Sequence, residues 1–185
     1  HPQHRRQRQM CIRDRSYTKP LIGAINGVAV TGGLELALAC DFLIASDRAA
    51  FADTHARVGV MPGWGLSVLL PQAIGVRRAR EMSLTGNYID AQTAAAWGLV
   101  NRVVPHELLL ETVQSLASDI SSNDQKGVQQ MLKTYERTGD TTVAEGWEIE
   151  ASMGADWLKR SDFKPQKVAQ RRAEIQTRGR TQNRS

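Results

Sequence analysis

The chain has 185 residues, a hydrophobic content of 41% and a formal net charge of +5. Its length suits one domain with an appendage, and its apolar runs are too short to cross a membrane. The positive charge is confined to the ends, because residues 1–18 carry +4 and residues 159–185 carry +7, which leaves −6 on residues 19–158. The central part of the chain therefore lacks the basic surface of a nucleic-acid-binding protein.

Residues 1–18, HPQHRRQRQMCIRDRSYT, contain few apolar side chains and show no periodicity. We expect a disordered or unrelated leader there, without the apolar segment of a signal peptide. The two cysteines, Cys11 and Cys40, form neither a CxxC pair nor a disulfide framework. This usage favours a reducing compartment, and we predict a cytoplasmic protein.

After Pro20, short apolar segments alternate with glycines and a short helical pattern. Glu35 is the one carboxylate of this helical pattern, which follows Gly32 and Gly33 and ends near residue 41. Four segments have the length and composition of buried strands: 21–25, 28–30, 42–45 and 51–52. Strand, helix and strand in close succession indicate an α/β fold.

Beyond residue 53 the pattern becomes mainly helical. Glycines and prolines between 59 and 65 predict a loop, followed by a helix that starts near Trp64 and breaks near Pro71. Further elements are expected in this order: a helix with a basic face over 76–84, a helix over 91–97 capped by Asp90 and ended by Gly98, and a strand over 99–104. Helical apolar spacing then continues towards a basic tail. We divide the chain into a leader (1–18), an α/β body (19–110) and a helical region (111–185).

The segment around Glu35 has the composition of a binding site for a polarised oxygen. Glycines at a helix start allow a ligand to approach the backbone, and the first-turn N–H groups attract negative charge. An ionised glutamate in an apolar helix costs free energy to bury unless it has a partner or a chemical task. Alternatively, Glu35 interacts only with the helix dipole at the protein surface.

Three sequence segments extend this pattern: KPLIGAINGVAVTGGLELALACD (19–41), SDRAAFADTHARVGVMPGWG (46–65) and LTGNYIDAQTAAAWGLVNRVVP (84–105). In this order and spacing they resemble the enoyl-CoA hydratase/isomerase, or crotonase, family over about residues 19–175. The resemblance implies a crotonase-like spiral of ββα units with a C-terminal helical region, assembled as a homo-trimer or hexamer. It also implies an acyl-CoA substrate and no metal or other cofactor.

The resemblance assigns roles within the first two segments. Gly32 matches a residue whose N–H group stabilises the enolate oxygen, and Glu35 matches the first of two acid/base glutamates. The second glutamate lies twenty positions further on, where this chain has His55. His55 either replaces that glutamate, since imidazole also transfers protons near neutral pH, or only hydrogen-bonds its loop. Asp53 is a weaker candidate, because in an extended segment it would point differently from His55.

Substrate contacts are expected around the same glycines. Trp64 stands where the family commonly has a small residue in the loop that lines the acyl pocket. If it points inward it shortens the pocket, and otherwise it anchors the core. Thr31 occupies a position that is usually glycine or alanine. The substrate-binding residues implied by the resemblance are Gly32, Gly33, Pro62, Gly63 and Trp64.

The family also has an N-terminal half before the Lys19-Pro20 segment, with the loop that gives the first oxyanion N–H. Here only residues 1–18 precede that segment, so we expect an N-terminally truncated member that is poorly active by itself. For the parent protein the first hypothesis is an enoyl-CoA hydratase or dehydratase. An enoyl-CoA isomerase, or another crotonase-type enzyme with a single glutamate, is the second. A non-catalytic acyl-CoA-binding subunit is the third.

Overall fold

The structure is a computed structural model that describes residues 18–139, 141–160 and 164–182. The leader expected over residues 1–18 lies outside these residues apart from Thr18. The chain divides into two compact units at the junction of Leu132 and Lys133. Both sheets belong to the first unit.

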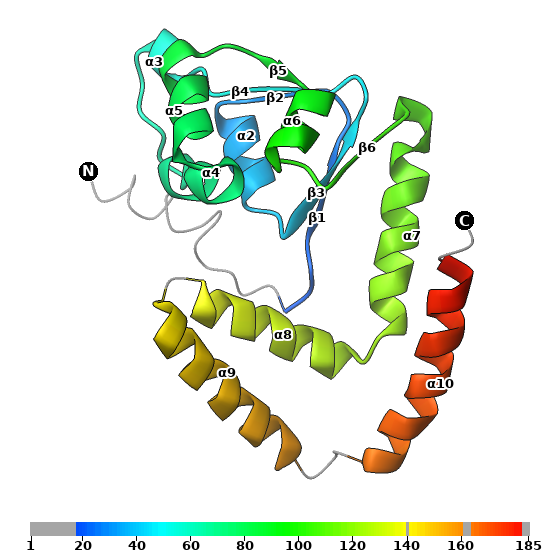
Figure 1. Cartoon of the computed structure of the whole chain (residues 1–185). Coiled ribbons are helices and arrows are strands. Elements are labelled where there is room, and N and C mark those ends of the chain that lie inside the picture. The colour runs from blue at the N-terminus through cyan, green and yellow to red at the C-terminus, as the bar shows by residue number, and fades with distance from the viewer. Residues whose placement is uncertain (1–17, 140, 161–163, 183–185) are drawn as a thin grey trace. The chain divides into compact units, whose positions relative to one another are not determined.

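Two three-stranded sheets form the centre of the first unit (Figure 1). One sheet is parallel throughout and has the order β1 (Ile22–Ile25), β3 (Phe42–Ser46), β6 (Arg102–Val104). The other has the order β2 (Val28–Val30), β4 (Ala50–Ala52), β5 (Ile89–Asp90), with only β5 antiparallel to its neighbour. All four strands expected near the N-terminal end of the body are therefore confirmed.

Each pass of the chain contributes one strand to each sheet. The chain leaves β1 at Asn26-Gly27 and enters β2, and it leaves β3 at the polar turn that includes Asp47 and enters β4. Helix α2 (Gly32–Leu38) connects β2 to β3 between these two passes. Because β1 pairs with β3 and β2 with β4, both in parallel, the passes stack as turns of a ββα spiral. This is the α/β architecture that the sequence predicts.

Apolar side chains from both sheets and from the helices beside them form one core. Leu34 and Phe51 are fully buried in it. Helices of this unit follow in the order α3 (His55–Val58), α4 (Leu66–Ile74), α5 (Val76–Thr85) and α6 (Ala91–Trp97). The cap expected for α6 is present, since the Asp90 side chain accepts a hydrogen bond from the Thr93 N–H at 2.7 Å and Gly98 ends the helix at φ +86°.

The break expected near Pro71 is wrong. Pro71 lies inside α4, and its carbonyl oxygen accepts a hydrogen bond from the Gly75 N–H at 2.9 Å. Proline removes one helical donor, and the rest of the short helix is retained. The helix ends instead at Gly75, whose φ of +81° and ψ of 152° start a new direction for α5.

The strand expected over 99–104 is shorter than predicted, because β6 begins at Arg102. The Leu99 N–H donates to the Ala94 carbonyl at 2.9 Å, so this part of the chain closes the end of α6. Beyond β6 the chain is helical as expected, with η1 (His106–Leu108), α7 (Leu109–Ser122), α8 (Gln125–Thr138), α9 (Val143–Leu158) and α10 (Pro165–Gln182). In the part of the chain that the structure describes, no helix is both long and apolar enough to cross a membrane.

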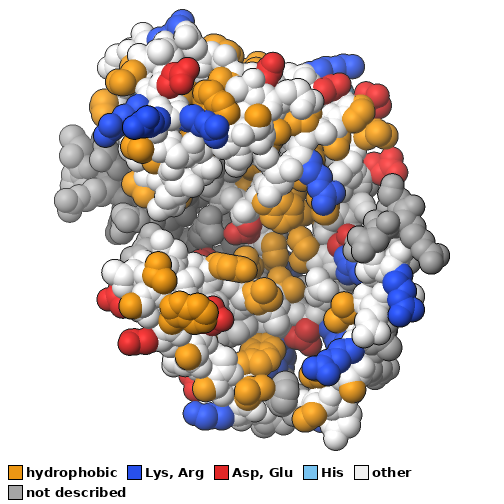
Figure 2. Space-filling model, in the orientation of Figure 1, with side chains coloured by type: hydrophobic (Ala, Val, Ile, Leu, Met, Phe, Trp, Pro, Cys, Tyr) orange, Lys and Arg blue, Asp and Glu red, His pale blue; other side chains and the backbone are white. Residues whose placement is uncertain are grey.

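Large hydrophobic side chains reach the surface at many points. Figure 2 shows them among scattered acidic and basic groups on the visible face. Met61 in the first unit is 84% exposed, and Trp147 in the second is 70% exposed. Scattered exposed apolar groups of this kind are common in proteins.

Candidate active site

The start of α2 presents a backbone donor that has no acceptor among the residues that the structure describes. The Thr31 carbonyl accepts a hydrogen bond from the Glu35 N–H at 3.0 Å, so that it points along the helix. In a trans peptide the N–H group points opposite to the carbonyl, and the Gly32 N–H therefore points away from the helix start. As the first helical residue, Gly32 has no acceptor within the helix. This N–H is available to a ligand oxygen.

Thr31 gives the helix start an unusual backbone conformation. Its φ is +47° and its ψ is −119°, and no other described non-glycine residue has a positive φ. A β-branched residue is strained in this region, which glycine adopts readily. The strain lies at the peptide that carries the Gly32 N–H. The neighbouring structure must therefore hold Thr31 in this backbone conformation.

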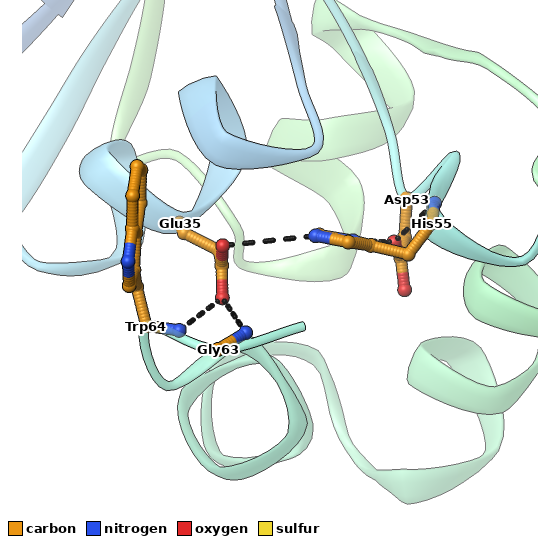
Figure 3. A network of polar contacts seen from close by, with 5 residues as sticks. All are labelled: Glu35, Asp53, His55, Gly63 and Trp64. Atoms are coloured by element: carbon orange, nitrogen blue, oxygen red, sulfur yellow. Dashed lines mark hydrogen bonds and ion pairs between the residues drawn. The ribbon is translucent and has the colours of Figure 1, made fainter. Parts of the chain in front are cut away.

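Glu35 is buried, with 3% of its surface exposed, and its carboxylate is held by the loop before α4. Its Oε1 atom accepts hydrogen bonds from the Gly63 N–H at 3.2 Å and the Trp64 N–H at 2.7 Å (Figure 3). These bonds offset part of the cost of burying a carboxylate. They also fix the direction of Oε2, which faces a different partner.

That partner is His55, the first residue of α3, whose side chain is 8% exposed. Its Nε2 atom lies 3.7 Å from Oε2 of Glu35, and Figure 3 shows the ring between the carboxylates of Glu35 and Asp53. The distance is within ion-pair range when the imidazole is protonated. His55 thus lies beside Glu35, and its role as an acid/base group stays a prediction.

Asp53 belongs to the same cluster, and the expectation that it points differently from His55 is wrong, because side chains two residues apart in an extended segment share one face. Its Oδ1 atom lies 2.6 Å from Nδ1 of His55 and accepts the His55 backbone N–H at 3.2 Å. The chain leaves the extended conformation directly after β4, since Thr54 has φ −96° and ψ 10° and α3 begins at His55. An aspartate two residues before a helix start is typical of such a turn, and this signal could have identified Asp53.

The protonation of this pair follows from its surroundings. Burial alone would raise the pKa of Asp53, but hydrogen bonds from the Ser83 hydroxyl of α5 and from His55 outweigh it, so that the pKa is lowered. Asp53 is therefore ionised at neutral pH and can only accept a hydrogen bond. His55 then donates through Nδ1–H, which leaves Nε2 to face Glu35.

The ring of Trp64 lies against Gly32. A Cβ atom placed on Gly32 would lie 3.1 Å from Cζ3 of the indole. The side chain is still 40% exposed, which places it at the edge of the site and not in the core. Pro62 is partly buried next to Gly63, whereas a Cβ atom on Gly33 would meet no atom within 4 Å.

Residues 6–177 match the model of the enoyl-CoA hydratase/isomerase family. The chain is a member of that family. A probable peroxisomal enoyl-CoA hydratase 1 of Arabidopsis thaliana is 51% identical over 107 residues, which are 58% of this chain and 40% of the relative. A carnitinyl-CoA dehydratase of Proteus mirabilis is 38% identical over 131 residues, 71% of this chain and 50% of the relative.

The solved structure of an enoyl-CoA hydratase from Mycobacterium tuberculosis H37Rv aligns with a TM-score of 0.68 and 52% identity. The alignment covers 78% of this chain and 66% of that chain. This hydratase/isomerase family member spans about half the length of the curated relatives that it matches. Within the described residues, no group of three or more histidine, cysteine or acidic side chains is arranged to hold a metal ion.

Proposed function

We propose that this family member is part of an enzyme that adds water to the double bond of an enoyl-CoA thioester, or removes it in the reverse direction. The observation that carries this proposal is the buried pair of Glu35 and His55, 3.7 Å apart, with Glu35 on a helix whose first residue, Gly32, has no acceptor for its N–H among the described residues. A general base, a general acid and an oxyanion donor are the groups that such a reaction needs.

The thioester oxygen accepts a hydrogen bond from the Gly32 N–H, and the dipole of α2 adds to the same field. Glu35 removes a proton from a water molecule as the water oxygen bonds to Cβ of the enoyl group. The π electrons of the Cα–Cβ bond move towards the carbonyl, and an enolate forms. Loss of an N–H donor that stabilises such an enolate oxygen typically lowers the rate about 10²–10³-fold.

The enolate returns its electron pair to Cα, which takes the Nε2 proton of an imidazolium His55 and leaves the ring neutral with its remaining proton on Nδ1. The proton that Glu35 gained from water then restores His55 across the short gap between Oε2 and Nε2. Water is thereby added across the double bond with no net change in the enzyme. No step needs an oxidant or a reductant, so we propose no cofactor beyond the coenzyme A of the substrate.

Trp64 supports a narrow acyl pocket. Its indole contacts Gly32 and its backbone N–H holds Glu35, so an acyl chain bound to both residues passes the ring. We propose that the enzyme prefers short or flat acyl groups, because a bulky chain would need the indole to move. Gly63 helps to position Glu35 through its backbone N–H bond. Pro62 precedes Gly63 and Gly33 follows Gly32, so we propose that both also line the substrate site.

One observation supports a second candidate function. Glu35 is the only glutamate among the five residues that form this polar network, and moving a proton between two carbons needs only one such group. The alternative is therefore an enoyl-CoA isomerase that shifts a double bond without adding water. Both functions use the same enolate and the same Gly32 N–H.

The protein expressed from its complete coding sequence tests these proposals. We would incubate it separately with crotonyl-CoA and with a 3-enoyl-CoA and quantify the products by mass spectrometry. The proposal expects 3-hydroxyacyl-CoA from crotonyl-CoA. Isomerisation of the 3-enoyl-CoA without water addition would favour the isomerase. Binding of both thioesters without any product would favour a non-catalytic acyl-CoA-binding subunit.

The exposed apolar side chains support self-association as a trimer or hexamer, which we propose for the complete protein. Sedimentation velocity would test this by the mass of the particle. A monomer at micromolar concentration would contradict it. The cytoplasmic location stays a prediction from the cysteine content.

A further inference from the structure

We propose that Asp53 is the positioning residue of His55: its carboxylate holds Nδ1–H and thereby makes Nε2 the nitrogen that exchanges protons with Glu35 and the substrate. The inference rests on the proposed function, because it assigns a residue to the same proton transfer. Asp53 touches neither reacting atoms nor substrate. It acts through the imidazole, whose second nitrogen sets the tautomer and the ring direction.

Two hydrogen bonds join His55 to a single carboxylate oxygen of Asp53. Oδ1 accepts the ring Nδ1–H at 2.6 Å and the backbone N–H of the same residue at 3.2 Å. Two bonds from one acceptor restrict both the backbone turn and the side-chain rotation of His55. The side chains of both residues are at least 90% buried, so water does not compete strongly for these donors.

Two elements, β4 and α5, act on Asp53. It follows β4 directly, where the preceding Ala52 is fully buried, and the Ser83 side chain of α5 helps to lower the pKa of its carboxyl. The backbone before Asp53 is therefore anchored by the sheet. The carboxylate keeps Nδ1–H in place while Nε2 gives or takes the proton that moves in the reaction.

A structural role offers a competing explanation, in which Asp53 only stabilises the start of α3. The two explanations differ in their dependence on the imidazole. A positioning residue loses its effect on turnover once His55 is removed, whereas a structural residue keeps its effect. The test is therefore a double-mutant cycle of Asp53→Asn and His55→Gln, measured as kcat and KM for crotonyl-CoA hydration.

We expect Asp53→Asn to lower kcat about 10–100-fold with a KM change of less than about threefold, because asparagine keeps the shape and loses the charge. In the His55→Gln background the same change should alter kcat by less than about twofold. An undiminished effect in that background, or an unchanged kcat in Asp53→Asn alone, would overturn the proposal. Asp47→Asn is the matched control, since Asp47 bonds the Ser46 hydroxyl, which contacts His106 outside the site.

The ring tautomer provides a readout that needs no turnover. Long-range proton–nitrogen NMR of the wild-type protein should show His55 protonated at Nδ1 when the ring is neutral. A neutral ring protonated at Nε2 would overturn the assignment even in a fully active enzyme. If the wild-type protein hydrates no thioester, the proposed function fails, and the tautomer alone decides whether Asp53 holds His55 as described.

Discussion

Nε2 of His55 lies 3.7 Å from Oε2 of Glu35, although the two side chains come from different helices. The spiral explains this proximity. Glu35 follows β2 and His55 follows β4, and these strands are parallel neighbours in one sheet, with Val28 opposite Ala50. Segments that follow parallel neighbouring strands emerge at the same edge of the sheet. The site is therefore a consequence of two successive ββα turns.

The first prediction concerns the space above Gly32. Gly32→Ala should lower kcat about tenfold or more. The new methyl group would lie 3.1 Å from the Trp64 ring, and relief of this contact would shift the backbone N–H of residue 32. Gly27→Ala is the matched control, since a Cβ atom there meets nothing within 4 Å. Steady-state kinetics of both variants would check this. Equal turnover in the two variants would contradict the prediction that a methyl group at position 32 disturbs the N–H donor.

A second prediction concerns the acyl group. Trp64→Ala should raise the ratio of kcat/KM for a long-chain enoyl-CoA over that for crotonyl-CoA by about tenfold, because the indole no longer limits the pocket. Competition assays with the two thioesters would measure this ratio directly. Trp147→Ala removes an indole that is 70% exposed and should leave the ratio unchanged. An unchanged ratio in Trp64→Ala would show that the indole does not line the acyl path.

The strained residue before α2 gives a prediction about stability. Thr31→Gly should raise the free energy of unfolding by about 1 kcal/mol, because relief of a positive φ exceeds the extra flexibility of glycine in the unfolded chain. Thr31→Ala keeps a Cβ atom at φ +47° and should give no such increase. Urea unfolding would compare them. A Thr31→Gly variant no more stable than Thr31→Ala would contradict the assigned strain.

The lowered pKa of Asp53 predicts a contribution to stability that depends on pH. Because the pKa is lower in the folded than in the unfolded chain, this contribution is present above the ordinary value of 3.8 and disappears as the pH falls through the folded value. The difference in unfolding free energy between wild type and Asp53→Asn should therefore narrow on acidification. Unfolding curves from pH 7 to pH 2 would test this, and a difference that stays constant below pH 3.8 would contradict it.

Local chemistry made most of the fold predictable. Short β-branched and alanine-rich segments bounded by polar turns identified β1 to β4, and Asp90 and Gly98 marked both ends of α6. These features depend on neighbouring residues alone. The helix break predicted at Pro71 was wrong because local propensity did not decide there. Packing of α4 against the core retains the helix although proline disfavours it.

The candidate site was less accessible to such reasoning. Glu35 and Gly32 stand out in one segment, but the orientation of Asp53 depends on a backbone turn of one residue, Thr54. The contact of Trp64 with Gly32 joins two segments about thirty residues apart. Contacts of this kind follow from the stacking of the spiral and leave no periodic signal in the sequence.

The central claim is that the carboxylate of Glu35 transfers the proton of the added water. Glu35→Gln tests it most directly, because glutamine can still accept the Gly63 and Trp64 N–H bonds but is a far weaker base. We predict that kcat for crotonyl-CoA hydration falls about 10²–10⁴-fold while the thermal unfolding temperature changes little. Glu107→Gln, at an exposed position of η1, should match the wild type. Undiminished hydration by Glu35→Gln would contradict the account.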